Sequence, residues 1–465
     1  MAIRVPPCPH CEQLQTQLAE LQARLTELER QLAQARKNSS TSSKPPSSDM
    51  VKPPKPAAAG QGPRRHGGQP GHPRHDRLAF PPEAVTLREH RLACCPDCGH
   101  SLQEAQTAPH VLQQVDIPQQ PLRIEEHRGL ASWCPQCRQV YYAPLPAPVV
   151  AGGLLGPRLT ALVAFLKGVC HASYSTIRKF LRDVVGVILS RGQLAKVIAK
   201  VSQALADTHA ELEQNLAEQP QLNVDETGHK DSGARWWTWC FRAAQYTVFH
   251  LDRSRGSGVL LEVLGADFRG VLGCDYFSAY RKYMRECGIV VQFCLAHLIR
   301  DVKFLLTLPD AATQAYGQRL REALRGLFAV IHQRDYLSTA DFAAALAAAR
   351  QRVLAEATEE VPASGPAHNL AQRFRRHGEA YFQFITTPGV EPTNNLAEQA
   401  IRFVVIDRHI TQGTRGETGR HWCERIWTVM ASCAQQGRSV WDFLCTAIEA
   451  HFHGSQAPSL LPIPP

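Results

Sequence analysis

Two stretches of sequence, Gln221-Leu-Asn-Val-Asp225 and Gly270-Val-Leu-Gly-Cys-Asp275, decide the fold of this 465-residue chain. Each is a short apolar run that ends in an aspartate, as a buried strand of an α/β sheet does. In such sheets, functional side chains gather at the carboxyl ends of the strands. We therefore expect Asp225 and Asp275 to lie at one site, although each aspartate taken alone would more often be a turn residue.

The sequence around these stretches predicts the rest of a mixed α/β sheet. Strands rich in aromatic and β-branched residues are predicted over residues 235–243, 246–251 and 289–293, and helices over 257–264 and 295–306. Three consecutive strands followed by alternating helices and strands are typical of such a sheet.

Carboxylates at adjacent strand ends repel each other unless a cation lies between them. Mg²⁺ prefers oxygen ligands and keeps several of its waters, so Asp225 and Asp275 predict a magnesium site. Glu226 is a poor co-ligand, because strand alternation directs it to the face opposite Asp225.

A third acidic candidate follows a long helical stretch predicted over residues 311–384. The sequence GVEPTNNLAEQAIR then begins a new helix, capped by Asn394 or Thr393, with Glu398 one turn in. Glu398 and Arg402 share a helix face, so a simple exposed ion pair between them is the alternative.

Helices are also predicted before the sheet, over residues 156–217. Two of them, at 173–185 and 190–205, begin with a capping serine. The short glycine-containing joint between them suits a helix-turn-helix and suits an ordinary helical hairpin equally well.

Paired cysteines indicate structural zinc. Two C-x-x-C knuckles offer four thiolates for one tetrahedral site: Cys95, Cys98, Cys134 and Cys137. The region between them is too small and polar for an unaided core, so zinc would supply folding energy. A further pair, Cys8 and Cys11, has no second pair nearby, and its role stays open between zinc shared across a dimer and free thiols.

The N-terminal region reads as a coiled coil joined to a linker. Leucines spaced by four and three form a heptad seam within residues 12–36: Leu14, Leu18, Leu21, Leu25, Leu28 and Leu32. We expect this helix to form a homo-oligomer, the alternative being a lone amphipathic helix packed on its own domain. Residues 38–82 are rich in Ser, Pro and Gly, which predicts a flexible linker.

The net charge of +9 is concentrated in this linker. Eight Lys or Arg and two Asp lie between Lys37 and Arg77, a net of about +6. A basic tether can neutralise DNA phosphates without reading sequence, whereas composition alone fits a solvated linker equally well.

Membrane and secreted classes are excluded by pattern. The most apolar stretch, residues 154–169, contains Arg158 and Lys167, and the N-terminus has no apolar signal-peptide core. Fifteen cysteines are an odd number, and C-x-x-C pairs in a cytosolic protein indicate metal rather than disulfides. We expect a cytoplasmic protein.

An ordered set of motifs resembles the insertion-sequence-66 family of bacterial transposases. The set is NSSTSSKPPSSD, GGQPGH, the two cysteine knuckles, VDETG, CDYFSAY, CLAHLIR and TNNLAEQAIR. The resemblance implies a multidomain α/β chain whose catalytic domain is ribonuclease-H-like. The expected order is a coiled coil (1–37), linker (38–82), zinc ribbon (83–150), helical DNA-binding region (151–219), catalytic domain (220–430, with a helical insertion at about 307–386) and helical tail (431–465).

The resemblance also implies a D-D-E triad of catalytic carboxylates. Its members would be Asp225 of VDETG, Asp275 of CDYFSAY and Glu398 of TNNLAEQAIR, separated by 50 and 123 residues. This chain has Thr393 and Gln399 where the family often has Asp and Arg. Glu391 lies nearby, so the third carboxylate stays open between Glu398 and Glu391.

Two Mg²⁺ or Mn²⁺ ions about 3.5–4 Å apart can activate water or a DNA 3′-hydroxyl and stabilise an in-line transition state. We expect Asp225 to bridge both ions, with Asp275 and Glu398 binding one each. The same site would then serve end cleavage and strand transfer.

Cys294 and His297 share a helix face in CLAHLIR. Two ligands do not complete a zinc site, so packing in the core is the simple interpretation. The resemblance favours a place beside the active site, where His297, Arg300 and Arg402 are candidates for phosphate contact. The glycine-rich segment 409–422 is a DNA-contacting loop or a surface hairpin.

The function expected from this resemblance is a DNA transposase acting on the ends of its element and on target DNA. Accessory proteins of the same element and an association with the nucleoid are further expectations. The alternative is a non-catalytic DNA-binding regulator or a decayed transposase, for which the coiled coil, zinc ribbon and basic linker would suffice.

Overall fold

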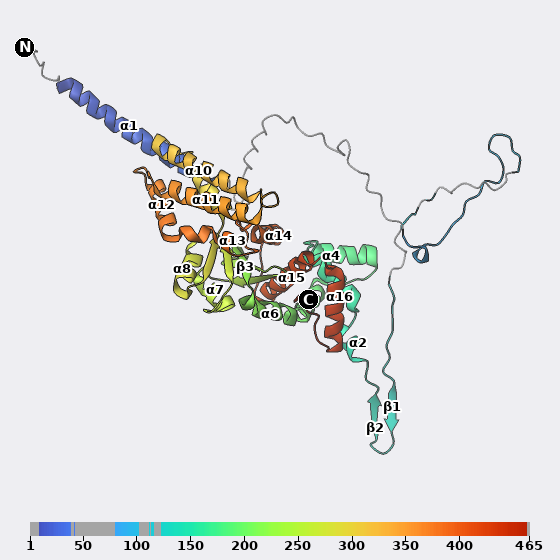
Figure 1. Cartoon of the computed structure of the whole chain (residues 1–465). Coiled ribbons are helices and arrows are strands. Elements are labelled where there is room, and N and C mark those ends of the chain that lie inside the picture. Colours follow the sequence, from blue (N-terminus) through green and yellow to red (C-terminus); the bar gives the residue numbers. More distant parts are fainter. Residues whose placement is uncertain are drawn as a thin grey trace, which may run out of the picture. The chain divides into compact units, whose positions relative to one another are not determined.

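The computed structural model of the chain describes residues 9–38, 41, 80–101, 111, 113–115 and 122–462. Most of the predicted linker and Cys8 lie outside the described residues. The chain divides into two compact units, one of residues 54–126 and one of the remainder. The larger unit contains a mixed α/β core, as the sequence predicts (Figure 1).

A five-stranded sheet organises this core, with strands in the order β5-β4-β3-β6-β7. Their bounds are Gln221–Asp231 (β3), Ala234–Arg242 (β4), Thr247–Asp252 (β5), Val271–Cys274 (β6) and Val290–Phe293 (β7). The first three strands are antiparallel, whereas β3, β6 and β7 run parallel. All five predicted strands are confirmed.

Strand β3 is longer than the sequence predicts. The predicted end at Asp225 is wrong, since β3 pairs with β4 as far as Asp231 opposite Ala234. Pairing with β6 covers only the stretch from Gln221 to Asn223. Asp225 therefore lies just beyond the point where β3 and β6 stop pairing, in the middle of a strand rather than at its end.

Helices cover and connect the strands. Helix α7 (Ser257–Leu264) joins β5 to β6, α8 (Ser278–Cys287) joins β6 to β7, and α9 (Leu295–Leu305) follows β7. Helix α14 (Asn395–Thr411) packs against β3 and β4, and α15 (Glu417–Gln435) packs against β5. The sheet is buried on both sides, with Trp239, Phe241 and Phe293 fully enclosed.

The helical regions predicted before β3 and after α9 are confirmed. The first comprises α3 (Pro157–Gly168), α4 (Tyr174–Phe180), α5 (Arg191–Ala204) and α6 (Ala206–Gln214). Helix α2 (Ala147–Gly152) precedes the predicted start at residue 156, and the helix predicted over 173–185 continues after α4 as a π-helical turn, Leu181–Val185. Ser173 caps α4, and Ser190 forms a capping box with Gln193 at the start of α5. The second comprises α10 (Ala311–Ile331), α11 (Thr339–Thr358), α12 (Gly365–His377) and α13 (Gln383–Thr386).

The segment Ala147–Gly168 is long and apolar enough to cross a membrane by length and composition alone. It contains two helices, because α2 ends at Gly153, which has a positive φ, and α3 begins at Pro157. Helix α3 packs against α5 and against α16 (Val440–His453). These contacts are those of a core helix in a folded domain.

Two elements near the N-terminus expose their apolar side chains. Helix α1 (Pro9–Ala35) carries the six heptad leucines, each about half exposed. The hairpin of β1 (Ala131–Cys134) and β2 (Gln139–Tyr142) exposes Trp133 and Tyr142. Neither element can bury these residues within itself.

Candidate active site

Asp225 lies in a half-buried position on β3, next to the buried Val224 and Glu226. Its Oδ1 accepts a hydrogen bond from the backbone N–H of Glu226 at 2.9 Å. Burial raises the pKa of Asp225 well above its usual range, and the negative charges of Glu226, Asp275 and Glu398 raise it further. The two other predicted acids therefore come close enough to Asp225 to act on its charge.

Asp275 follows the last residue of β6 and leads into α8. Its Oδ1 accepts a hydrogen bond from the backbone N–H of Phe277 at 2.8 Å, which fixes the carboxylate at the strand end. Burial raises the pKa of Asp275. The guanidinium groups of Arg255 and Arg373 oppose this shift and do not cancel it.

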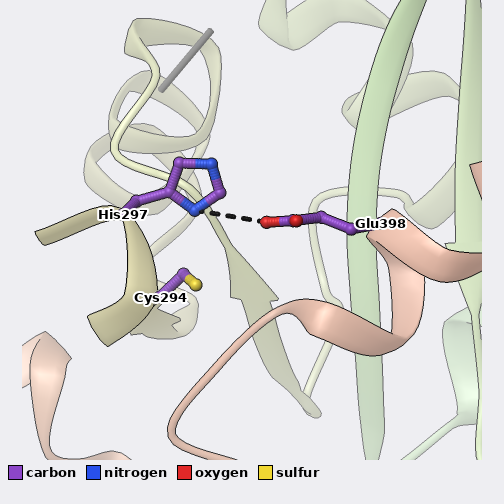
Figure 2. Close-up of side chains that lie close together, drawn as sticks. All are labelled: Cys294, His297 and Glu398. Atoms are coloured by element: carbon purple, nitrogen blue, oxygen red, sulfur yellow. Dashed lines mark ion pairs between the residues drawn. The ribbon is translucent and has the colours of Figure 1, made fainter. Parts of the chain in front are cut away.

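Glu398 lies in the first turn of α14 and faces helix α9 (Figure 2). Its Oε1 is 3.6 Å from Nδ1 of His297, and its Oε2 is 3.4 Å from Nη2 of Arg300. Arg402 is exposed and forms no ion pair with Glu398 in the described structure. The simple alternative, an exposed pair between Glu398 and Arg402, is therefore wrong. Glu391 is exposed on the preceding loop.

Asn394 has a role that the sequence did not reveal. It is the first residue before α14, yet its side chain makes no capping hydrogen bond. Instead its Nδ2 donates to the backbone oxygen of Val224 at 2.8 Å, and its Oδ1 accepts from Nδ2 of Asn223 at 2.9 Å. Asn394 thus attaches the start of α14 to β3 beside Asp225, which positions Glu398.

Glu226 is engaged away from Asp225. Its carboxylate pairs with Arg255 at 2.7 Å and accepts a hydrogen bond from the hydroxyl of Tyr280. Burial raises the pKa of Glu226 to about 7, and the charge of Asp275 contributes in the same direction. Because its two oxygens already bind Arg255 and Tyr280, Glu226 stabilises this edge of the sheet and is not free to bind a metal ion.

Cys294 and His297 also reach this site. One ligand atom from each of Cys294, His297 and Glu398 lies within 4.8 Å of the other two, and this is the one such group of potential metal ligands in the described part of the chain. Asp225, Asp275 and Glu398 do not form such a group, since their oxygens are not all within 4.8 Å of one another. Asp225 nevertheless interacts electrostatically with the other two acids. Cys294 and His297 are buried like core residues, and in addition they lie next to the predicted acid Glu398.

The two cysteine knuckles each form a tight turn. In the first, the backbone N–H groups of Asp97 and Cys98 lower the pKa of the Cys95 thiol. In the second, at the tip of the β1-β2 hairpin, the N–H of Cys137 donates to Sγ of Cys134 at 3.4 Å and lowers its pKa. Such N–H···S bonds favour the thiolate form, which is the form that binds metal.

A basic pocket of about 500 Å³ lies farther along β3 and α14. Its cationic lining comes from Lys230 and Arg235 of the β3-β4 hairpin and from Arg408 and His409 in the last turn of α14. Lys230 and Arg235 are exposed, whereas Arg408 is half-buried and hydrogen-bonded to Thr227 at 3.0 Å. The pocket therefore presents exposed positive charge from Lys230 and Arg235 together with a hydrogen-bonded guanidinium.

The segment after α14 closes this end of the hairpin. The hydroxyl of Thr414 donates a hydrogen bond to Oδ1 of Asp231 at 2.9 Å, and its Oγ1 is hydrogen-bonded to Nε2 of His229 at 3.1 Å. Asp231 also forms an ion pair with Arg420 of α15. Within the glycine-rich segment 409–422, residues 412–416 form a short loop between α14 and α15, and Thr414 of this loop is hydrogen-bonded to β3. The surface hairpin is therefore wrong, and contact of the loop with DNA stays a prediction.

Comparison with known protein families identifies two parts of the chain. Residues 152–421 match the family described as Transposase IS66 family, and residues 4–78 match a family of unknown function, DUF6444. The search of the curated proteins gives no match. The first match covers more than half of the chain and includes the sheet, the three acids and the basic pocket. The chain therefore belongs to the IS66 family of transposases.

Proposed function

We propose that this chain is a DNA transposase that binds the ends of its insertion sequence, cleaves them and joins them to target DNA. One observation carries the proposal. Asp225, Asp275 and Glu398, which are far apart in the sequence, are half-buried in one region, where the charges of the other two raise the pKa of Asp225 beyond the effect of burial. Acids gathered in this way are costly for folding and are kept where they are needed for chemistry.

The residues present suit a divalent cation. Three carboxylates supply only oxygen ligands, which Mg²⁺ and Mn²⁺ prefer. Oε1 of Glu398 is buried and accepts no hydrogen bond, and burial, followed by the negative charges of Glu226, Asp275 and Glu398, raises the pKa of Asp225. Asp225 would hold two ions, with Asp275 and Glu398 holding one each. Bound ions of this kind act as Lewis acids toward phosphate oxygens.

The protein's own part is to position DNA and the acids. Burial, together with the charges of Arg300 and Arg373, lowers the pKa of His297 to about 3. His297 is therefore neutral at physiological pH and would meet a phosphate as a hydrogen-bond donor, not as a cation. Arg402, exposed on α14, supplies the positive charge on the same helix.

The remaining regions fit a transposase that works as an oligomer. The mixed sheet, with Asp225 on its central strand and Asp275 at the end of the neighbouring strand, supports a ribonuclease-H-like catalytic domain. The exposed leucines of α1 support a coiled coil, and the two knuckles support a structural zinc ribbon. We place the protein in the bacterial cytoplasm, on the nucleoid, with DNA as its partner.

The test is metal-dependent nicking and joining of labelled DNA that carries the element ends. The full chain with Mg²⁺ or Mn²⁺ is expected to cut these ends, and the D225N and D275N variants are expected to bind them without cutting. A regulator or decayed copy would bind DNA in the same salt-dependent way and would not nick it with either ion.

A further inference from the structure

Cys294, His297 and Glu398 converge from two separate elements. Cys294 precedes α9, His297 lies in its first turn, and Glu398 lies in the first turn of α14. Figure 2 shows the three side chains directed toward a common space, within the 4.8 Å already described. The C-x-x-H spacing places the sulfur and the imidazole on one helix face, and the core contacts bring the carboxylate to them.

The cluster contains two polar atoms that the fold leaves unsatisfied. Nδ1 of His297 and Oε1 of Glu398 are both buried, both lack a hydrogen bond, and lie 3.6 Å apart. Burying such atoms without partners is unfavourable, because each loses its hydrogen bonds to water. A cation held between them would satisfy both.

The sulfur is also prepared for ligation. Cys294 is 1% exposed, and its Sγ accepts a hydrogen bond from the backbone N–H of Asn394 at 3.1 Å. Bonds of this type orient a thiolate and stabilise its negative charge on a metal. The same residue, Asn394, therefore supports both the sulfur and, through α14, the carboxylate.

We propose that Cys294, His297 and Glu398 form a binding site for a zinc-type transition-metal ion. Thiolate, imidazole and carboxylate together are the ligand set of Zn²⁺ and Co²⁺, and not of Mg²⁺. Bonds of about 2.0–2.3 Å require the ligand atoms to approach by roughly 1 Å from their present separation. Three protein ligands leave the fourth position of a tetrahedron open to water or to a DNA phosphate.

The site has a consequence for the reaction, and this part rests on the proposed function. Glu398 belongs to both metal sites, so a zinc-type ion held by Cys294 and His297 competes with Mg²⁺ for this carboxylate. Zinc would then inhibit Mg²⁺-dependent DNA cleavage, and the inhibition would depend on Cys294.

Arg300 offers a purely internal explanation of the cluster. Its guanidinium lies 3.4 Å from both Nε2 of His297 and Oε2 of Glu398, so it is itself a cation beside the two groups. Both distances are at the long limit for hydrogen bonds, and Nδ1 and Oε1 stay without partners. A metal ion accounts for these two atoms, which Arg300 does not.

Cobalt titration of the full-length, metal-stripped protein tests the site. The parent chain is expected to bind one more Co²⁺ per molecule than C294S or H297A, and to show stronger thiolate-to-cobalt absorption than either variant. Cobalt bound by the knuckle cysteines would contribute equally to every sample and cancel in the comparison. C287S, which changes a half-buried cysteine outside the cluster, is the matched control.

Further variants keep the outcome decisive. R300A removes the competing cation and is expected to tighten cobalt binding while leaving all ligands in place. Circular dichroism verifies that each variant is folded. Equal cobalt binding and equal spectra for the parent, C294S and R300A would overturn the proposed site. Cobalt binding that depends on Cys294 in a protein that never nicks DNA would retain the site and reject the proposed function.

Discussion

The two halves of strand β3 carry opposite chemistry. Asp225 is a half-buried carboxyl group with a raised pKa, surrounded by other acids. Lys230, five residues later, is exposed and lines a basic pocket. Helix α14 repeats the pattern, with Glu398 in its first turn and Arg408 in its last. Strand and helix pack together and hold these two regions at opposite ends.

Under the proposed function, this difference separates a place for metal from a place for DNA. Buried carboxylates lose hydration and need cations at close range, whereas exposed lysine and arginine attract phosphates through water. Ten residues of helix between Glu398 and Arg408 correspond to about 15 Å. That length spans about four base pairs of duplex at 3.4 Å per step, so one DNA strand can reach both regions.

The largest effect is expected from neutralising the acid region. D225N keeps the shape of the side chain and removes the charge that holds metal, so DNA cleavage is expected to fall by at least about 10³-fold. Rates of nicking on labelled ends measure this loss. D267N, which changes an exposed aspartate, is the control. A D225N protein that cuts DNA at the parent rate would remove Asp225 from the proposed active site.

The attachment between β3 and α14 is expected to have the next largest effect. N394A leaves the buried backbone oxygen of Val224 and the amide of Asn223 without partners, which costs about 2–4 kcal/mol of unfolding free energy. Displacement of Glu398 by about 1 Å is expected to slow cleavage by roughly 10²-fold.

Urea denaturation and nicking rates measure the two effects of N394A. N395A changes the neighbouring, exposed asparagine and is expected to match the parent in both. If N394A and N395A behave alike, Asn394 does not position the third acid.

The basic region is expected to control affinity and not the chemical step. K230E/R235E removes two exposed cations at the pocket rim, so DNA binding is expected to weaken by about 10-fold or more. The slope of log affinity against log salt concentration is expected to decrease by about 2 in magnitude. R334E/R352E carries the same charge change in the helical insertion. An equal loss in both double variants would show a general charge effect in place of a local site.

A buried acid outside both regions tests what burial alone does. Burial raises the pKa of Glu424 from 4.5 to about 7, while its Oε1 accepts the N–H of Leu251 at 2.7 Å. The folded state therefore favours the protonated acid, and the parent loses stability as pH rises from about 5 to 8.

Glutamine keeps the hydrogen-bond acceptor and carries no charge. The unfolding free energy of E424Q relative to the parent is expected to rise by up to about 3 kcal/mol across this pH range. Urea denaturation at a series of pH values measures the difference. E417Q, an exposed change on the same helix, is expected to track the parent. A constant difference between E424Q and the parent would mean that Glu424 keeps its ordinary pKa in the folded protein.

Local sequence pattern was sufficient for most of the fold and for part of the site. Apolar runs around Asp225 and Asp275 predicted β3 and β6, and capping serines predicted the starts of α4 and α5. The polar residues 226–231 gave no strand signal, because their pairing depends on the aromatic strand β4. A strand is stabilised by its partners as well as by its own residues.

The role of Asn394 was hidden for a similar reason. It follows the pattern of a helix cap, and its true partner, Val224, lies 170 residues away. Cys294 and His297 likewise become a candidate metal site only because the fold brings Glu398 next to them. Contacts between distant parts of the chain leave no periodic signal in either part.

The same contacts have an evolutionary consequence. The backbone N–H of Leu295 donates to the oxygen of Pro392 at 2.9 Å, so the chain leaves the core and returns to it at almost one point. The insertion from α10 to α13 lies within this loop, and the length of a loop has little effect on its closure entropy. Parts of the insertion pack against the core, as the ion pair between Arg373 of α12 and Asp301 of α9 shows. Relatives are therefore expected to vary in length at its exposed turn, residues 332–336, where an experimenter can insert a reporter domain far along the chain from the third acid.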